Sequence, residues 1–355
     1  MKKSLLALAA LTAFAGGASA QSSVTLFGVL DVNARHQDNT GSAGSVKSLS
    51  TDGNASSRLG FRGVEDLGGG MRAGFWLEAG TNPDVGTTNA KFFNRRSTVS
   101  LMGGFGEIRL GRDYTPTFWN QTVFDPFGTN GVGAQTNLMS QVAGAGAAAS
   151  GSVLASGAAT QVRADNSIGY FLPALGGIYG QAMVAAGEGT IGNKYFGGRL
   201  GYAAGPVNVA VSAGETEITP ALDLKTANIG GSFNIGFMTL MGQFHRSEFD
   251  GPGINREQTN WLAGVTVPLG AGTFKASYGK VDTDITNTQE VSANQIAVGF
   301  VYDLSKRTAL YTHAARINND GNGTNGANFV IPGGPGGITR GQNSTGYEFG
   351  VRHSF

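Results

Sequence analysis

Apolar and polar residues alternate with a period of two in segment after segment of this chain, from residue 23 to the last residue. In residues 23–35 the even positions include Leu26 and Leu30, whereas the odd positions include Asp31 and Asn33. The same alternation returns at 71–79, 206–214, 261–267 and 346–355. Successive side chains of a β-strand point to opposite faces. The sequence therefore predicts an all-β protein whose strands each have one apolar and one polar face.

The N-terminus has the three parts of a secretory signal peptide. Lys2 and Lys3 form a basic start, Leu5–Ala15 is apolar, and Ala18-Ser19-Ala20 is a small-residue cleavage site. We expect residues 1–20 to be removed and residues 21–355 to form one exported domain.

No later segment has the run of about 20 apolar residues that a membrane-spanning helix needs. The nearest candidate, Val142–Thr160, consists mostly of Ala, Gly and Ser, whose small side chains gain little free energy in hydrocarbon. We interpret it as a loop or a short helical insertion. Only 14% of the residues are charged, whereas soluble domains have about 25%.

Short turn signals divide the mature chain into pairs of strands. There are seven of them, at residues 65–70, 103–106, 173–177, 204–206, 234–236, 268–272 and 303–306. Each interval holds two strand patterns separated by a polar stretch. Seven turns between eight pairs predict sixteen antiparallel strands.

An even number of strands, short turns at one rim and long polar loops at the other are typical of an outer-membrane β-barrel. Lipid offers no partner to an exposed N–H or C=O, so only a closed sheet can cross it without edges. Sixteen strands enclose a water-filled channel that accommodates the polar face. A soluble β-sandwich would also alternate, but its polar face would point outward.

Four segments resemble a known family. They are Gln21–Asp31, Ser57–Gly68, Phe105–Arg112 and Tyr347–Phe355. In this order they are similar to the general diffusion porins of β-proteobacteria, within the Gram-negative porin family, and in particular to its anion-selective members. The resemblance implies a homotrimer in the outer membrane, in contact with lipid and lipopolysaccharide, that passes small anionic solutes. It also implies that the barrel-assembly machinery reads the terminal Phe355.

The resemblance further implies that the third loop folds into the lumen and narrows it. The long interval Thr115–Thr160 is the candidate, and its Phe118-Trp119 pair could pack against the inner wall. The tract at 142–160 is longer than the usual third loop of the family. The size of the constriction therefore stays open.

Alternation identifies arginines that would face the lumen. Arg58 falls on the polar face of its strand, because Leu59 and Phe61 occupy the apolar face. Arg163 likewise falls on the face opposite to Ile168. In the Asn94-Arg95-Arg96 segment the outward positions Val99 and Leu101 favour Arg96, although a bulge could exchange it with Arg95. The family resemblance implies that such arginines cluster at the constriction. Glu78 and Asp125 are candidates for its acidic side.

A wall of cations lowers the electrostatic barrier for negative solutes, so the arginines predict anion selectivity. They could also be solvated wall residues that neighbouring carboxylates balance. Which solutes permeate stays open, including a narrower specificity for dicarboxylates or aromatic acids.

Other classes of function have little support. The four histidines are scattered and no cysteine is present, so we expect no metal site. The Gly321-x-Gly323-x-x-Gly326 match lies in a polar loop with no helix after it, so we expect no nucleotide cofactor. A formal charge of +1 offers no basic field for nucleic acid.

One alternative of a different class remains, an outer-membrane barrel that acts mainly as an adhesin or receptor. Its support is the pair of long polar loops at 250–258 and 318–342. A lipid-processing barrel enzyme would need a catalytic Ser/His pair on the barrel exterior, and parity places none there.

Overall fold

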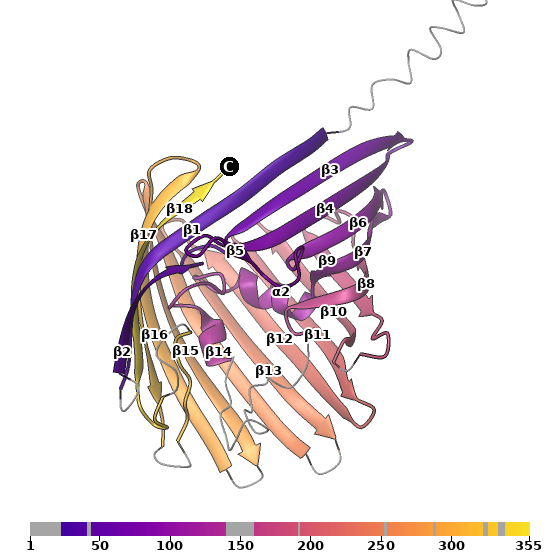
Figure 1. Ribbon diagram of the computed structural model, residues 1–355. Helices are drawn as coiled ribbons and strands as arrows, with labels where there is room; N and C mark the ends of the chain where they lie inside the picture. The colour runs from indigo at the N-terminus through magenta and orange to yellow at the C-terminus, as the bar shows by residue number, and fades with distance from the viewer. Residues whose placement is uncertain are drawn as a thin grey trace, which may run out of the picture.

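The strands of the chain form one closed antiparallel barrel (Figure 1). The computed structural model describes residues 23–40, 44–139, 160–190, 192–251, 254–286, 289–321, 326–332 and 338–355. The predicted signal peptide and nearly all of the 142–160 tract lie outside these ranges. No described helix is long and apolar enough to cross a membrane.

Within the described ranges, sixteen strands make up the ring, as the turn spacing predicted. They are β1 (Ser23–Asn39), β3 (Arg58–Gly68), β4 (Met71–Asn82), β6 (Arg96–Gly103), β7 (Gly106–Tyr114), β8 (Arg163–Phe171), β9 (Ile178–Ala185), β10 (Lys194–Ala204), β11 (Val207–Thr219), β12 (Leu222–Asn234), β13 (Thr239–Gly251), β14 (Ile254–Leu269), β15 (Gly272–Thr286), β16 (Gln289–Asp303), β17 (Thr308–Asn319) and β18 (Ser344–Ser354).

The ring closes between the first and last strands. β18 pairs with β17 on one side and with β1 on the other, with Leu30 opposite His353. Each of the seven predicted short turns joins two neighbouring strands at the same rim. The barrel therefore has a short-turn end and a long-loop end.

The alternation predicted from the sequence separates the outer and inner faces. On β1 the outward Leu26 is 54% exposed, whereas the inward Asp31 is fully buried. On β18 Tyr347, Phe349 and Val351 are exposed. A continuous apolar outer surface is what a barrel in hydrocarbon requires.

The strand position next to β1 is shared by two separate strands. β1 pairs with β3 through residues 23–29 and with β2 (Gly44–Thr51) through residues 32–39. Residues 52–57 lie between β2 and β3, and Asp52 has a positive φ of 64°. We call residues 52–57 the inward segment, because its residues Ala55 and Ser56 line a cavity inside the barrel. A two-residue strand, β5 (Thr87–Thr88), folds back and pairs antiparallel with Thr81 and Asn82 at the end of β4.

The third loop, described at residues 115–139 and 160–162, folds inside the ring. It carries α2 (Pro116–Val123), which contacts β9 to β12 from within, and a 3-10 helix η1 (Gln135–Leu138) beside β15 and β16 (Figure 1). Pro116 at the helix start has the fixed φ that a first helical turn needs. Loop side chains bind the wall: Asn120 Nδ2 donates to Asn228 Oδ1 (2.7 Å). The wall also binds the loop, since Gln295 Nε2 donates to the carbonyl of Gly133 (3.0 Å).

An apolar core fills part of the lumen, which alternation alone did not predict. Its members come from the third loop, from residues 326–332 of the last loop and from the inner faces of β12, β13 and β15–β17. They are Phe127, Val132, Leu138, Leu224, Phe249, Val281, Val291, Ala293, Ala297, Ala315, Ile317, Ala327, Phe329 and Ile331. The expectation of a polar inner face is therefore wrong here, because two loops cover the wall and remove it from water.

Candidate pore constriction

A cavity of about 830 Å³ remains between the third loop and the wall formed by β1, β3, β4 and β6–β10. Its lining includes six arginines but only two carboxylates, Glu78 and Asp113, among the described residues. The arginines are Arg58, Arg62, Arg95, Arg96, Arg109 and Arg199. Cations therefore outnumber anions on this wall.

Arg58, Arg95 and Glu78 form an ion-pair cluster within this group. The Nε of Arg95 lies 2.5 Å from Oε1 of Glu78, and the Nε of Arg58 lies 3.8 Å from the same oxygen. Trp76 Nε1 donates to the second carboxylate oxygen at 3.0 Å. Glu78 therefore has three partners and balances only part of the positive charge.

Both Arg95 and Arg96 line the cavity, although the sequence suggested that only one of the two would face the lumen. Arg96 begins β6 opposite Glu78 and faces inward by register. Arg95 precedes the strand, where its backbone N–H still donates to the Glu78 carbonyl (3.1 Å). Because Arg95 lies before the regular strand, its side chain is not bound by the alternation of β6.

Arg163 joins the group without lining the cavity. Register shifts between β7 and β8, and Asn166 has a positive φ of 53°, which marks a β-bulge. The bulge places Ala164 among the buried residues on the inner side. The Arg163 guanidinium instead lies 4.2 Å from the centre of the Tyr114 ring and donates to Tyr114 Oη (2.6 Å).

Asp125 lies inside the third loop rather than on the cavity wall. Its carboxylate accepts hydrogen bonds from the backbone N–H groups of Phe127 (2.9 Å), Gln135 (3.0 Å) and Thr129 (3.2 Å). Burial raises the pKa of this carboxyl, although the three N–H groups oppose the shift. An Asp carboxylate that accepts hydrogen bonds from nearby backbone N–H groups stabilises a turn, here within the third loop.

Four further charged residues that the sequence analysis did not single out also line the cavity: Arg62, Arg109, Arg199 and Asp113. Arg62 is four residues after Arg58 on the same strand face, and Arg109 lies between the outward Ile108 and Leu110. The same alternation could therefore have found both of them.

Aromatic rings support most of these arginines. The Arg96 guanidinium lies 4.5 Å from the Trp76 ring centre, Arg109 lies 3.9 Å from Phe171, and Arg199 lies 4.8 Å from Tyr179. Arg62 lies over both Phe27 (5.3 Å) and Trp76 (5.1 Å). Such contacts hold a guanidinium in place while its N–H edge stays available to a ligand.

Two of the six arginines have no ion pair within the described residues. Arg62 forms none, and Arg199 instead donates to Asn120 Oδ1 (2.8 Å) and Tyr179 Oη (3.3 Å). A concave wall with an excess of one charge concentrates solutes of the opposite sign. This arrangement therefore favours anions.

The histidines do not assemble a metal site in the part of the chain that the structure describes. His245 hydrogen-bonds to Gln121 and Ser247, and His313 to Glu348. Each is a single buried ring within a polar network.

The terminal Phe355 continues the pairing of the closing strand. Its backbone exchanges two hydrogen bonds of 3.1 Å with Gly28 on β1. A side chain at Gly28 would bring Cβ within 2.3 Å of the Phe355 ring, so glycine leaves room for that ring.

Comparisons with known proteins agree with this architecture. A family model described as Gram-negative porin matches residues 7–322. Outer membrane porin protein 32 of Delftia acidovorans is 38% identical over an alignment of 368 positions that covers 100% of both chains. An outer membrane porin protein of Bordetella pertussis is 28% identical and covers 90% of this chain and 95% of its own. The structure of an anion-selective porin from Comamonas acidovorans has a TM-score of 0.81 at 35% identity, covering 94% of this chain and 100% of that one.

Proposed function

The chain belongs to the Gram-negative porin family, and from this premise we propose that its arginine wall makes it an anion-selective channel for small hydrophilic solutes. The family consists of outer-membrane channels for passive diffusion rather than enzymes, as the four sequence segments predicted. The protein is accordingly an outer-membrane β-barrel. The anion selectivity is the part that this proposal adds.

The excess of arginines over carboxylates on the cavity wall carries the proposal. Selectivity in a pore arises where charges lie close to the permeating ion and the passage is narrow. The sum of distant surface charges matters less, since salt screens interactions beyond about 8 Å. A relative named as anion-selective, at 35% identity over the full barrel, supports the same conclusion.

Arg58, Arg95 and Arg96 are proposed to supply the positive side of the constriction and Glu78 its acidic side. Arg163 is proposed to act through Tyr114 and Arg95, since its Nε donates to the Arg95 carbonyl at 2.8 Å. Asp125 is proposed to shape the loop rather than to contact solutes.

Export and assembly complete the proposal. We propose that residues 1–20 are a cleaved signal peptide and that Phe355 belongs to a signal for the barrel-assembly machinery. We further propose a homotrimer embedded in lipid and lipopolysaccharide. The exposed apolar outer faces of β1 and β18 suit either lipid or a second copy of the chain.

An adhesin or receptor role has less support. The last loop was one of its two motivating features, and its Phe329 and Ile331 are buried inside the barrel against the third loop. Their burial fits narrowing of the pore better than display of a binding surface.

The direct test is the current through the purified protein in a planar bilayer under a salt gradient. The proposal predicts stable steps that occur in threes and a reversal potential that favours chloride. Channels that favour the cation would contradict anion selectivity. A correctly folded barrel that carries no current would contradict the channel itself.

A further inference from the structure

We propose that Asp31 and Glu348, two buried carboxylates on the closing strands, are positioning residues that set the width of the constriction. They hold the inward segment and the tip of the third loop, residues 130–132, against each other. The inference rests on the proposed channel function and adds to it which residues fix the size limit.

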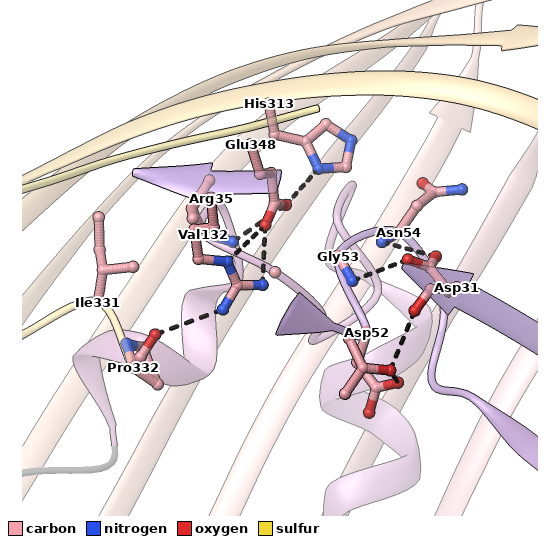
Figure 2. A network of polar contacts seen from close by, with 12 residues as sticks. Asp31, Arg35, Asp52, Gly53, Asn54, Val132, His313, Ile331, Pro332 and Glu348 are labelled. Atoms are coloured by element: carbon pink, nitrogen blue, oxygen red, sulfur yellow. Dashed lines mark hydrogen bonds and ion pairs between the residues drawn. The ribbon is translucent and has the colours of Figure 1, made fainter. Parts of the chain in front are cut away.

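Asp31 organises the inward segment. Its Oδ1 accepts from the backbone N–H of Gly53 (3.1 Å), and its Oδ2 accepts from Asn54 (3.0 Å) and Ala55 (2.8 Å) (Figure 2). Its own backbone N–H donates to Ser57 Oγ (3.0 Å). Three consecutive N–H groups that the interrupted sheet leaves without a strand partner thus converge on one carboxylate.

Glu348 organises the tip of the third loop. Its cross-strand neighbours are Arg35 on β1 and His313 on β17. Oε2 forms an ion pair with Arg35 Nη2 (2.8 Å), and Oε1 lies 2.9 Å from His313 Nδ1. Oε1 also accepts from the backbone N–H of Val132 (3.3 Å), and Arg35 Nη1 extends the network to the carbonyl of Pro332 in the last loop (Figure 2).

Three glycines allow these parts to approach one another. A Cβ on Gly131 would lie 2.2 Å from both Glu348 Oε1 and the Gly53 carbonyl oxygen, and Gly131 has a φ of 68°. A Cβ on Gly350 would lie 2.4 Å from the ring of Tyr311, whose hydroxyl reaches across that position to Asp31. A Cβ on Gly53 would meet the same hydroxyl at 2.2 Å. The backbone of the loop tip therefore lies directly against the Glu348 carboxylate on the wall and against the backbone of the inward segment.

The contact between the two segments leads directly to the pore. Ser56 Oγ donates to Asn130 Oδ1 (2.8 Å), and Arg58 Nη1 donates to the Ser56 carbonyl (3.0 Å). Ala55, Ser56 and Asn130 all line the cavity that holds the arginines. If either carboxylate lost its hold, the cavity would widen at this edge and Arg58 would lose a partner.

The test uses full-length Glu348→Gln and Asp31→Asn proteins in bilayers and in liposomes that swell as uncharged sugars of increasing size enter. Neutralisation should raise single-channel conductance and admit larger sugars than the wild-type channel does. Anion selectivity should weaken at the same time, since wider pores place solutes farther from the arginines. Asp303→Asn is the matched control, because among the described residues the Asp303 carboxylate forms a single ion pair, an exposed one with Arg352 at the short-turn end.

A second route avoids the buried charges in case those variants fail to fold. Ser56→Ala removes only the hydrogen bond between the segments, and Gly131→Ala inserts the Cβ that has no room. Both should shift the sugar limit upward, while barrel formation, measured by heat-modifiable gel mobility, stays intact.

A wild-type sugar limit and conductance in these folded variants would overturn the positioning role. Because that result needs a conducting wild-type protein, it differs from the failure of the channel proposal, in which the wild-type protein carries no current.

Discussion

The two halves of the lumen differ although the same sheet surrounds both. On the side of β3–β10 the inner face borders the large cavity and carries six arginines, and we call this side the wet half. On the side of β12–β17 much of the inner face joins an apolar core with two loops, and we call this side the dry half. A ring of sixteen strands is too wide to be filled by its own side chains. Loops therefore close one half of the lumen, and the arginines concentrate in the half that stays open.

The dry half also explains how a long polar loop is held inside a water-filled barrel. Burial of Phe127, Phe329 and Ile331 is favourable at about 25 cal/mol per Å² of apolar surface. Polar anchors such as Gln295 then fix the orientation of the loop backbone. The apolar burial that closes the dry half therefore also positions the third loop, which lines the cavity on the other side.

The sharpest contrast comes from adding the same negative charge to each half. Gln295→Glu replaces a buried donor to the carbonyls of Gly133 and Ala134 with an unpaired charge, and we expect a loss of about 3–5 kcal/mol. Gln181→Glu, in the wet half beside the arginines, should change stability by less than about 1 kcal/mol. Urea-induced unfolding in lipid vesicles measures the stability of both variants. Equal losses would contradict the difference between the wet and dry halves.

The outer surface should show no such contrast, because both halves present apolar side chains outward, and a charge there is unfavourable against lipid or against a second copy of the chain. Val351 on β18 and Ile229 on β12 are 44% and 53% exposed. Val351→Arg and Ile229→Arg should each cost about 2–4 kcal/mol if they lie near the middle of the membrane. The same unfolding experiment tests this, and a neutral effect at both positions would mean that the assigned outer face is wrong.

A smaller effect is expected when the acidic side of the wet half is removed. Glu78→Gln deletes one of the two lining carboxylates and its ion pairs with Arg95 and Arg58. Glu78 itself is buried, but Arg58 and Arg95 line the cavity, so the charges left behind keep access to water and the stability loss should be about 1–2 kcal/mol. The reversal potential should move further toward chloride, and a move toward the cation would argue that Glu78 holds the arginines in place instead.

The regular parts of the molecule could be predicted from sequence because they follow from local geometry. Alternation fixed the faces of β1, β3 and β18, and Gly-rich turns fixed the pairing of strands. Arg58, Arg96 and Glu78 lie in regular strands, so parity located their side chains on the inner face.

The irregular parts could not be predicted, because they depend on contacts between distant segments. The bulge before Ser167 shifts the parity of Arg163, and the inward segment is held by Asp31 from another strand. The apolar core of the dry half could not be predicted, because it forms only where two loops pack against the inner wall. Its one local signal is the apolar run Phe329–Ile331 within a loop that is otherwise rich in Gly, Asn and Pro.

We propose that arginines of the wet half make the channel anion-selective, and the reversal potential under a salt gradient reports this selectivity. The double variant Arg58→Ser with Arg62→Ser removes two lining charges from β3, and Arg352→Ser, outside the cavity, is the matched control. We predict a clear shift of the double variant toward cations and a wild-type value for the control. An unchanged reversal potential in a folded, conducting double variant would contradict the account.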